Sequence, residues 1–503
     1  MTKQIRNLGV FLSVLYLALF LQVNRLTFFG AEELRDNPSN NREVERDFSS
    51  PRGSVSTADG VVVAESIASD DRFELQRVFP LGERYAHITG YYGLTTGSAG
   101  LEEAYNDELA GRTIDFDLED VTDLFVEREQ VGNLTLSVRD DVQQVAQQQL
   151  GDREGAVVAL DPRNGAILAM WSNPSYDPNL LSTHNDAEAQ ATSRVLDADE
   201  ENPRLSRVFQ ERFSPGSTFK IVTATAGVEE GRVSEDDPSY PVETAYQAPG
   251  AGQPIPNFGG SSCGGTLFVI LQQSCNSSFA KMGAEDAGIG PMVETAEAFG
   301  FNDTVPIDLP GAAGSVFPTE FDERNPVFLA QSSIGQFDVQ ATPLQMALVA
   351  AAVANDGKIM SPHVVQEVRD DQGEVIDNAD EDELSEPMSP ATAGLLRRGM
   401  VSVVTDGSAT RLDDGIEGFE VGGKTGTAQI GDSGQSNAWI IGFAGPPGET
   451  PHVAVAVIVQ AQDGVSEQTG GRVAAPIGAE VMRAALEPSA PGDEAASGPS
   501  GEG

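Results

Sequence analysis

The sequence predicts a mixed α/β protein with more than one folded unit. A chain of 503 residues exceeds one ordinary domain and is long enough to bury a large core. Residues 155–170 form two apolar runs around a Pro-Arg-Asn-Gly turn, which is the pattern of a β-hairpin. Residues 452–460 predict another strand, and Pro476 suits the first position of a closing helix that ends at Leu486. Strands and helices therefore share the C-terminal part of the chain.

The composition makes the protein strongly anionic. Asp and Glu number 77 against 31 Lys and Arg, which gives a net charge of -46. Such a field repels phosphates, so no nucleic-acid partner is expected. Lysines are scarce, so each is informative; they are Lys3, Lys220, Lys281, Lys358 and Lys424. Adaptation to a high-salt or alkaline habitat and a codon bias toward arginine remain alternative explanations of this composition.

Residues 8–29 predict a transmembrane anchor. The run from Leu8 to Val23 is apolar and continues less regularly to Phe29, and a bilayer needs about 20 such residues. Basic residues precede the run and acidic residues follow it, which places residues 1–7 in the cytoplasm and the rest of the chain outside the cell. A cleaved signal peptide is the alternative, but Phe29 stands where a small residue is wanted. A single-pass protein of the cell membrane is therefore expected.

The part outside the membrane divides into three stretches by composition. Residues 30–150 mix short apolar segments with acidic ones and hold no concentrated chemical motif, so we expect a non-catalytic mixed α/β module. Residues 151–486 form a second domain, in which the acidic residues 370–387 predict an exposed loop. Residues 487–503 contain no aromatic or branched aliphatic side chain and predict a disordered acidic tail.

The second domain contains a serine and a lysine at helical spacing. Residues 218–229 predict a helix, so Ser217 and Lys220 lie on one face at its start. A serine becomes nucleophilic when a base takes its proton, and a lysine can be that base when burial or a nearby cation lowers its pKa. Alone, the pair is equally well explained by a capping serine and a surface lysine.

Two further motifs follow in a fixed order. They are Ser274-Cys-Asn276, an S-x-N, and Lys424-Thr-Gly-Thr427, a K-T-G. The ordered set S-x-x-K, S-x-N and K-T-G is a known signature of penicillin-binding proteins and class A β-lactamases. Here it uses two of the scarce lysines, which makes coincidence a poor explanation.

Histidine chemistry is disfavoured. No G-x-S-x-G surrounds the candidate serine, and no histidine pair has metal-ligand spacing, so neither a Ser-His-Asp triad nor a metal or other cofactor is expected. All histidines stand outside the three motifs: His87, His184, His363 and His452.

On these motifs the chain resembles class B penicillin-binding proteins, and among them the actinobacterial penicillin-binding protein A type. The likeness covers most of the chain, at residues 51–55, 85–90, 174–179, 215–220, 333–336 and 424–427. The resemblance implies a dimerisation or pedestal module followed by a transpeptidase domain. In that domain an antiparallel five-stranded sheet, flanked by helices, meets an all-helical lobe.

The resemblance also implies a serine D,D-transpeptidase that cross-links peptidoglycan stem peptides. Ser217 would attack the penultimate D-Ala of a donor, release the last D-Ala and pass the acyl group to an amine acceptor. β-Lactams would acylate the same serine. Lys220 would be its general base, Ser274 would relay a proton to the leaving amine, and Asn276 would bind the substrate amide.

The K-T-G segment would complete this site. Lys424 would supply positive potential, Thr425 and Thr427 would bind the terminal carboxylate, and Gly426 would leave room for the substrate backbone. The backbone N–H groups of Ser217 and Thr427 would form the oxyanion hole. Strand alternation puts the lysine on the face opposite the threonines, so its reach to the site is not explained by spacing.

The two cysteines lie close together in the predicted extracellular region. Cys263 and Cys275 can form a disulfide there, which would pin the S-x-N motif. Two buried thiols are the alternative. The disulfide is the favoured interpretation.

Other functions share these motifs. A D,D-carboxypeptidase differs only in using water as acceptor, and a β-lactamase would rarely need the module of residues 30–150. A penicillin sensor or wall-synthesis scaffold is the non-enzymatic alternative, which intact catalytic residues argue against. The chain holds no glycosyltransferase-sized region, so the resemblance implies a SEDS-type glycosyltransferase partner that contacts the anchor and the module.

Overall fold

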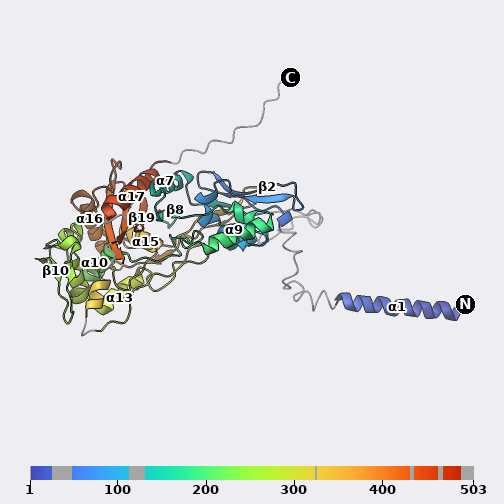
Figure 1. The fold of residues 1–503 in the computed structure, drawn as a ribbon, viewed down its shortest axis with the longest axis horizontal. Coiled ribbons are helices and arrows are strands. Elements are labelled where there is room, and N and C mark those ends of the chain that lie inside the picture. Colours follow the sequence, from blue (N-terminus) through green and yellow to red (C-terminus); the bar gives the residue numbers. More distant parts are fainter. Residues whose placement is uncertain are drawn as a thin grey trace, which may run out of the picture. The chain divides into compact units, whose positions relative to one another are not determined.

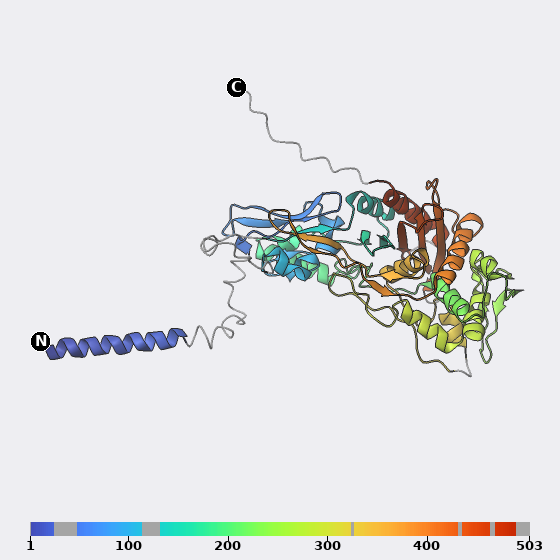
Figure 2. The same ribbon diagram turned by 180° about the vertical axis from the view of Figure 1, so that it is seen from behind.

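The structure is a computed structural model that describes residues 2–24, 48–112, 131–322, 326–430, 435–462 and 468–488. Residues 25–29 of the predicted anchor and residues 489–503 of the predicted tail lie outside these ranges. The chain divides into two compact units. One comprises residues 1–51 with 68–76, and the other residues 52–67 with 77–503. Figures 1 and 2 show the ribbon from opposite sides.

The first unit begins with helix α1 (Thr2–Asn24). Its large apolar side chains are exposed on every side, from Leu8 at 59% to Leu21 at 60%. Among the helices that the structure describes, none is both long and apolar enough to cross a membrane.

A five-stranded antiparallel sheet forms the centre of the second unit and confirms the sheet implied by the resemblance. The predicted hairpin forms two of its strands, and residues 452–460 supply the central one. Every residue of that central strand is buried, because helices cover both faces of the sheet. The spatial order is β17 (Glu420–Ile430), β18 (Gln435–Gly445), β19 (Val453–Val459), β7 (Gly155–Leu160) and β8 (Ile167–Asn173).

Helices pack on both faces of this sheet (Figure 1). Helices α17 (Gly470–Leu486) and α7 (Asp140–Leu150) contact each other and one face. Helix α15 (Pro343–Ala354) lies on the other, and its twelve residues, mostly Ala, Val and Leu, are all buried. Helix α16 (Pro390–Asp406) packs against edge strand β17.

The start of α17 differs from the prediction. The helix begins at Gly470, so Pro476 lies inside it and not at its first position. Proline has no N–H to donate to the carbonyl four residues earlier. That carbonyl, of Arg472, instead accepts a hydrogen bond of 3.2 Å from Arg411 Nη1. A side chain replaces the missing backbone donor, and the helix continues through the proline.

A helical lobe lies beside the β17 edge. Its core helix, α10 (Lys220–Glu229), follows a 3-10 turn at Gly216–Phe219 and agrees with the predicted helix. The lobe also carries two-stranded ribbons that the sequence did not predict, β9 (Tyr240–Glu243) with β12 (Cys263–Gly265) and β10 (Ala245–Tyr246) with β11 (Ile255–Pro256). The other helices are α11 (Leu267–Gln272), α12 (Asn276–Lys281), α13 (Ile289–Ala298) and α14 (Val327–Ser332).

A second sheet joins segments far apart in sequence. Its order is β15 (Val375–Asn378), β14 (Val365–Arg369), β6 (Asn133–Leu136), β1 (Val55–Ser56), β2 (Val62–Ala68) and β3 (Leu75–Val78). Residues 370–387 were predicted to be an exposed loop; most of them are exposed, but they include β15 and the short strand β16 (Glu383–Ser385), and Pro387 is buried. The acidic Asp377 is tolerated on β15 because it is an edge strand with every residue exposed to water.

Further elements of the described part of the chain are α4 (Ala86–Thr89), α5 (Leu101–Ala104), α6 (Asn106–Leu109), α8 (Asn179–Ser182) and α9 (Asp186–Ala198), and strands β4 (Tyr92–Gly93), β5 (Gly97–Ser98) and β13 (Ile359–Met360). Short 3-10 or π-helical segments lie at Gly82–Arg84, Phe258–Gly260 and Met282–Ala287.

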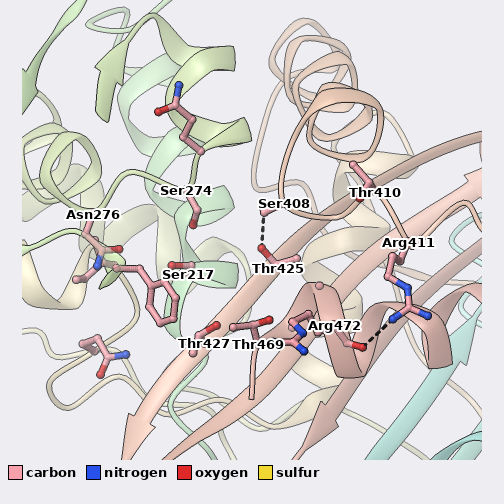
Figure 3. A pocket seen from close by; sticks show the side chains of 16 residues that line it. Ser217, Ser274, Asn276, Ser408, Thr410, Arg411, Thr425, Thr427, Thr469 and Arg472 are labelled. Carbon is pink, nitrogen blue, oxygen red and sulfur yellow. Dashed lines mark hydrogen bonds between the residues drawn. The ribbon is translucent and has the colours of Figure 1, made fainter. Parts of the chain in front are cut away.

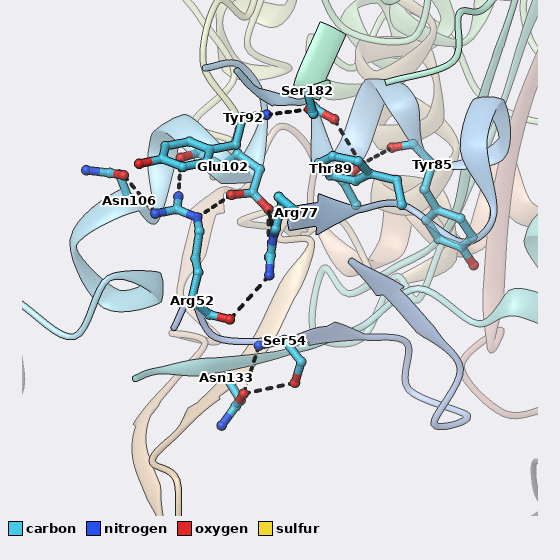
Figure 4. Close-up of polar contacts among 12 residues, drawn as sticks. Arg52, Ser54, Arg77, Tyr85, Thr89, Tyr92, Glu102, Asn106, Asn133 and Ser182 are labelled. Atoms are coloured by element: carbon cyan, nitrogen blue, oxygen red, sulfur yellow. Dashed lines mark hydrogen bonds and ion pairs between the residues drawn. The ribbon is translucent and has the colours of Figure 1, made fainter. Parts of the chain in front are cut away.

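A buried ion cluster supports this second sheet (Figure 4). Glu102 lies between two arginines: Arg52 Nε is 2.5 Å from one carboxylate oxygen and Arg77 Nε is 2.7 Å from the other. The guanidinium of Arg52 also stacks 4.2 Å from the ring centre of Tyr92. Burial opposes ionisation of Glu102, but the charges and hydrogen bonds of the two arginines outweigh it and hold its pKa below the ordinary value. The three charges are therefore mutually dependent.

Replacing Glu102 with glutamine should lower the free energy of unfolding by about 3–5 kcal/mol, because it leaves two buried guanidinium groups without a counter-charge. Urea denaturation measures the change. The control is Asp107→Asn, which removes a pair with Arg112 whose side chains are 60% and 44% exposed, and should change stability by less than about 1 kcal/mol. Equal effects of the two substitutions would contradict this account of the cluster.

Candidate active site

The three motifs meet at one pocket of about 380 Å³ between β17 and the helical lobe. Ser217, Ser274 and Asn276 line it from the lobe, and Thr425 and Thr427 line it from the strand (Figure 3). Residues more than 200 positions apart in sequence thus surround one cavity. None of the histidines is among its lining residues in the described part of the chain.

The backbone around Ser217 is held from two sides. Gly216 has a φ of 54°, and its N–H donates to the carbonyl of Gly335 at 2.9 Å. A Cβ on Gly335 would lie 2.1 Å from the Gly216 carbonyl oxygen, so only glycine fits there. On the other side, a Cβ on Gly216 would lie 3.0 Å from the carbonyl oxygen of Thr427. The turn that carries Ser217 is therefore held between residues 333–336 and β17.

Lys220, at the start of α10, is fully buried. Its Nζ donates to the carbonyl of Ser274 at 2.8 Å, to the hydroxyl of the same residue at 3.2 Å, and to Asn276 Oδ1 at 2.6 Å. Burial lowers the pKa of Lys220 well below its ordinary value, and the charge of Lys424 lowers it further. In the described contacts its ammonium does not reach Ser217 Oγ, and catalytic hydrogen bonds are often completed only when substrate binds.

Lys424 contacts the same serine, Ser274, from strand β17. It is fully buried, and its Nζ donates to Ser274 Oγ at 2.8 Å and to the carbonyl of Thr425 at 3.0 Å. Burial lowers the pKa of Lys424 to about 7. The long side chain thus curls past its own strand, which explains how it enters the site although the threonines line the pocket.

Ser274 is the meeting point of the two lysines. Its backbone is left-handed, with a φ of 55°, an uncommon state for a non-glycine residue. Its hydroxyl can accept from Lys220 and Lys424 at once, since a hydroxyl has two lone pairs and one proton. That proton is then free to be donated into the pocket.

Comparison with known proteins identifies the family. Residues 155–483 match the model of the penicillin binding protein transpeptidase domain. The chain belongs to the class B penicillin-binding proteins. Residues 52–134 match a second model, that of the penicillin binding protein A dimerisation domain.

Relatives match this penicillin-binding protein along nearly its full length. "Peptidoglycan D,D-transpeptidase PbpA" of Mycolicibacterium smegmatis is 36% identical, over 97% of this chain and 99% of the relative. The protein of the same name from Mycobacterium tuberculosis is 35% identical over the same shares. The solved imipenem acyl-enzyme complex of penicillin-binding protein A from M. tuberculosis shares 33% identity and a TM-score of 0.79, covering 88% of this chain and all of that one. Its penicillin G acyl-enzyme complex matches with a TM-score of 0.78.

The glycine of the K-T-G motif packs toward protein in this penicillin-binding protein. A Cβ on Gly426 would lie 2.9 Å from the Pro215 carbonyl oxygen and 2.9 Å from Trp439 Cβ. Because Gly426 has no side chain, β17 can approach the turn at residues 215–217. The adjacent Thr425 hydroxyl shares a hydrogen bond of 2.7 Å with Ser408.

A disulfide joins the two cysteines of the penicillin-binding protein. Cys263 lies in β12 and Cys275 caps α12, with Cα atoms 5.9 Å apart. Because Cys275 stands between Ser274 and Asn276, the disulfide ties the S-x-N motif to the β9–β12 ribbon.

Several pocket residues were missed by the sequence analysis. Ser408, Arg411 and Arg472 line the cavity but belong to none of the three motifs. Gly335 lies in a segment noted only for its family likeness. Their placement depends on chain segments that meet only in the folded protein, so motif spacing gave no signal.

Lys424 should make stability depend on pH. Its pKa is about 7 in the folded protein against an ordinary value of 10.5, so the unfolded chain binds the extra proton between these values and stability rises with pH across that window. Replacement by methionine removes this pH-dependent contribution of Lys424 to the free energy of unfolding. The stability of Lys424→Met relative to the wild type should therefore be greatest at about pH 7 and fall toward about pH 10. Chemical denaturation at each pH measures the difference.

The matched control for this experiment is Lys358→Met. Lys358 is an exposed lysine paired with Glu383 at 2.5 Å, and this carboxylate raises its pKa above the ordinary value. Its substitution should show no such trend between neutral pH and about pH 10. A Lys424→Met difference that is flat over this range would refute the prediction.

Proposed function

We propose that this penicillin-binding protein is a serine D,D-transpeptidase that forms its acyl-enzyme on Ser217. The observation that carries the proposal is the buried Lys220, which is held by Ser274 and Asn276 one helical turn from Ser217 and whose pKa is well below that of an ordinary lysine. A lowered pKa increases the share of lysine in the neutral form, which is the form that can act as a base. The names of the mycobacterial relatives support the reaction, and the solved acyl-enzyme complexes of one of them support its covalent course.

In the acylation step, Ser217 Oγ attacks the carbonyl carbon of the penultimate D-Ala while its proton passes to neutral Lys220. The negative charge that develops on the carbonyl oxygen is taken by the backbone N–H groups of Ser217 and Thr427. Loss of one such donor typically costs about 2.7–4 kcal/mol of transition-state stabilisation. Gly216 packs closely against Thr427 of β17, which supports the proposal that the N–H groups of Ser217 and Thr427 lie near one another.

The leaving amine then needs a proton. Ser274 can supply its hydroxyl proton to the terminal D-Ala nitrogen and be reprotonated by a lysine ammonium, since both Lys220 and Lys424 lie within hydrogen-bond distance of its oxygen. Asn276 Oδ1 accepts a hydrogen bond from Lys220, and Asn276 Nδ2 donates a hydrogen bond of 3.0 Å to the carbonyl of Pro256. When an amine acceptor attacks the acyl-enzyme, the same groups work in reverse. The product is a cross-linked peptide and free Ser217.

We further propose that residues 8–29 anchor the protein in the cell membrane, with residues 1–7 in the cytoplasm. The apolar run of the sequence from Leu8 to Val23 and the basic residues before it support this. The domain from 30 to 150 would then be a non-catalytic pedestal for the catalytic domain, 151–486. A SEDS-type glycosyltransferase would supply the glycan strands whose peptides are cross-linked.

A fluorescent penicillin tests the catalytic proposal. The wild type should be labelled covalently and Ser217→Ala should not. Lys220→Met should label about 10²–10⁴ times more slowly, since it loses the general base. Lys281→Met is the matched control, because this lysine is partly exposed and pairs with Glu285 in the same lobe; it should label like the wild type. An unlabelled wild type, or a labelled Ser217→Ala, would defeat the proposal.

Two forms of the chain test the anchor and its partner. The full-length protein should sediment with membranes and co-purify in mild detergent with a SEDS-type glycosyltransferase, whereas a chain that starts at Gly30 behind a cleavable signal should be recovered in the soluble fraction without that partner. Recovery of both forms in the soluble fraction would disprove the anchor. Absence of the glycosyltransferase from both would disprove the partner.

A further inference from the structure

The catalytic pocket has the opposite charge balance to the chain as a whole. Acidic residues outnumber basic ones by 77 to 31. Among the described residues that line the pocket, however, none is acidic, and the two that carry a charge are Arg411 and Arg472. Both lie on the side of β17 away from Ser274 and Asn276 (Figure 3). Positive charge is therefore concentrated where substrate binds.

The start of α17 brings Arg472 close to the K-T-G strand. A Cβ on Gly470 would lie 1.9 Å from the carbonyl oxygen of Trp439 in β18, and one on Gly471 would lie 2.3 Å from that of Ser408. Only glycine allows the helix to begin this near the sheet. Arg472 is the next residue, so its side chain enters the pocket beside the threonines of the strand.

The two arginines differ in what holds them. Arg411 Nη1 donates to the Arg472 carbonyl that Pro476 leaves without a backbone donor, and its Nε lies 3.5 Å from Asp414. The guanidinium of Arg472 makes no hydrogen bond or ion pair with any other described residue and is exposed to solvent. One arginine is thus fastened to the helix, and the other is available to a ligand.

We propose that Arg472 binds the terminal carboxylate of the donor stem peptide together with the hydroxyls of Thr425 and Thr427. A planar guanidinium matches a carboxylate with two parallel hydrogen bonds and is always charged, whereas hydroxyls are neutral donors. Arg411, which lines the same pocket, adds positive potential at this carboxylate. The inference rests on the proposed function, because this carboxylate belongs to the D-Ala that the reaction releases.

Acylation by benzylpenicillin and by its methyl ester tests the inference, since only the free acid carries the corresponding carboxylate. With the full-length protein in detergent, Arg472→Ala should lower the acylation rate constant for benzylpenicillin by at least about ten- to a hundredfold, the effect of losing even one of its charge-assisted hydrogen bonds to the carboxylate. The rate for the ester should not change. Arg472→Lys, which keeps the charge, should restore part of the loss.

Arg398→Ala is the matched control. This arginine lies on α16, is 60% exposed and pairs with Glu235, and it is not part of the pocket, so both rates should equal those of the wild type. Equal rates for Arg472→Ala and wild type with benzylpenicillin would overturn the inference, and so would an equal loss with acid and ester. A wild type that neither probe acylates would overturn the transpeptidase proposal as well, so the two failures are distinguishable.

Discussion

Two buried lysines that share one serine hydroxyl are the constraint on which the catalytic half of this protein depends. Lys220 and Lys424 donate to Ser274 from opposite sides, and in the described structure neither pairs with a carboxylate. Burying an ammonium group without a counter-charge is unfavourable, and the protein responds by lowering both pKa values. The same unfavourable burial supplies what serine acylation requires, a lysine able to accept a proton. Stability and reactivity are therefore opposed at this point of the fold.

The two halves of the larger unit treat buried charge in different ways. In the sheet that contains β1 and β6, Glu102 is matched by Arg52 and Arg77, so burial there produces a closed structural cluster. In the catalytic half the lysines are satisfied only by neutral oxygens. The paired charges of the first cluster stabilise the fold, whereas the unpaired lysines of the second have lowered pKa values. The packed layers around β17, β18 and β19 hold these lysines in place.

Small residues decide how closely the elements of the site approach one another. Gly335 contacts the turn at residues 215–217, and Gly426 lets β17 lie against that turn. Gly470 brings the start of α17 close to β17 and β18. At each position the space that a Cβ would occupy is already filled by a backbone or side-chain atom. The pocket is consequently assembled from backbone contacts, which hold its polar side chains more firmly than loops alone would.

The sequence by itself predicted the candidate reacting groups and several local elements. Motif order proposed Ser217, Lys220, Ser274 and Lys424 as candidates, and apolar runs with turn and helix-stop residues predicted the β7–β8 hairpin, β19 and α10, because each of these signals lies within a short stretch of sequence. Only the tertiary structure decided what distant segments do to one another. It brought residues 365–378 into the sheet of β1 and β6, carried Lys424 past its own strand, and let Arg411 replace the hydrogen bond that Pro476 removes from α17. The chemical character of a single residue can be read from the sequence because it is a local property. A contact between distant segments forms only in the complete fold.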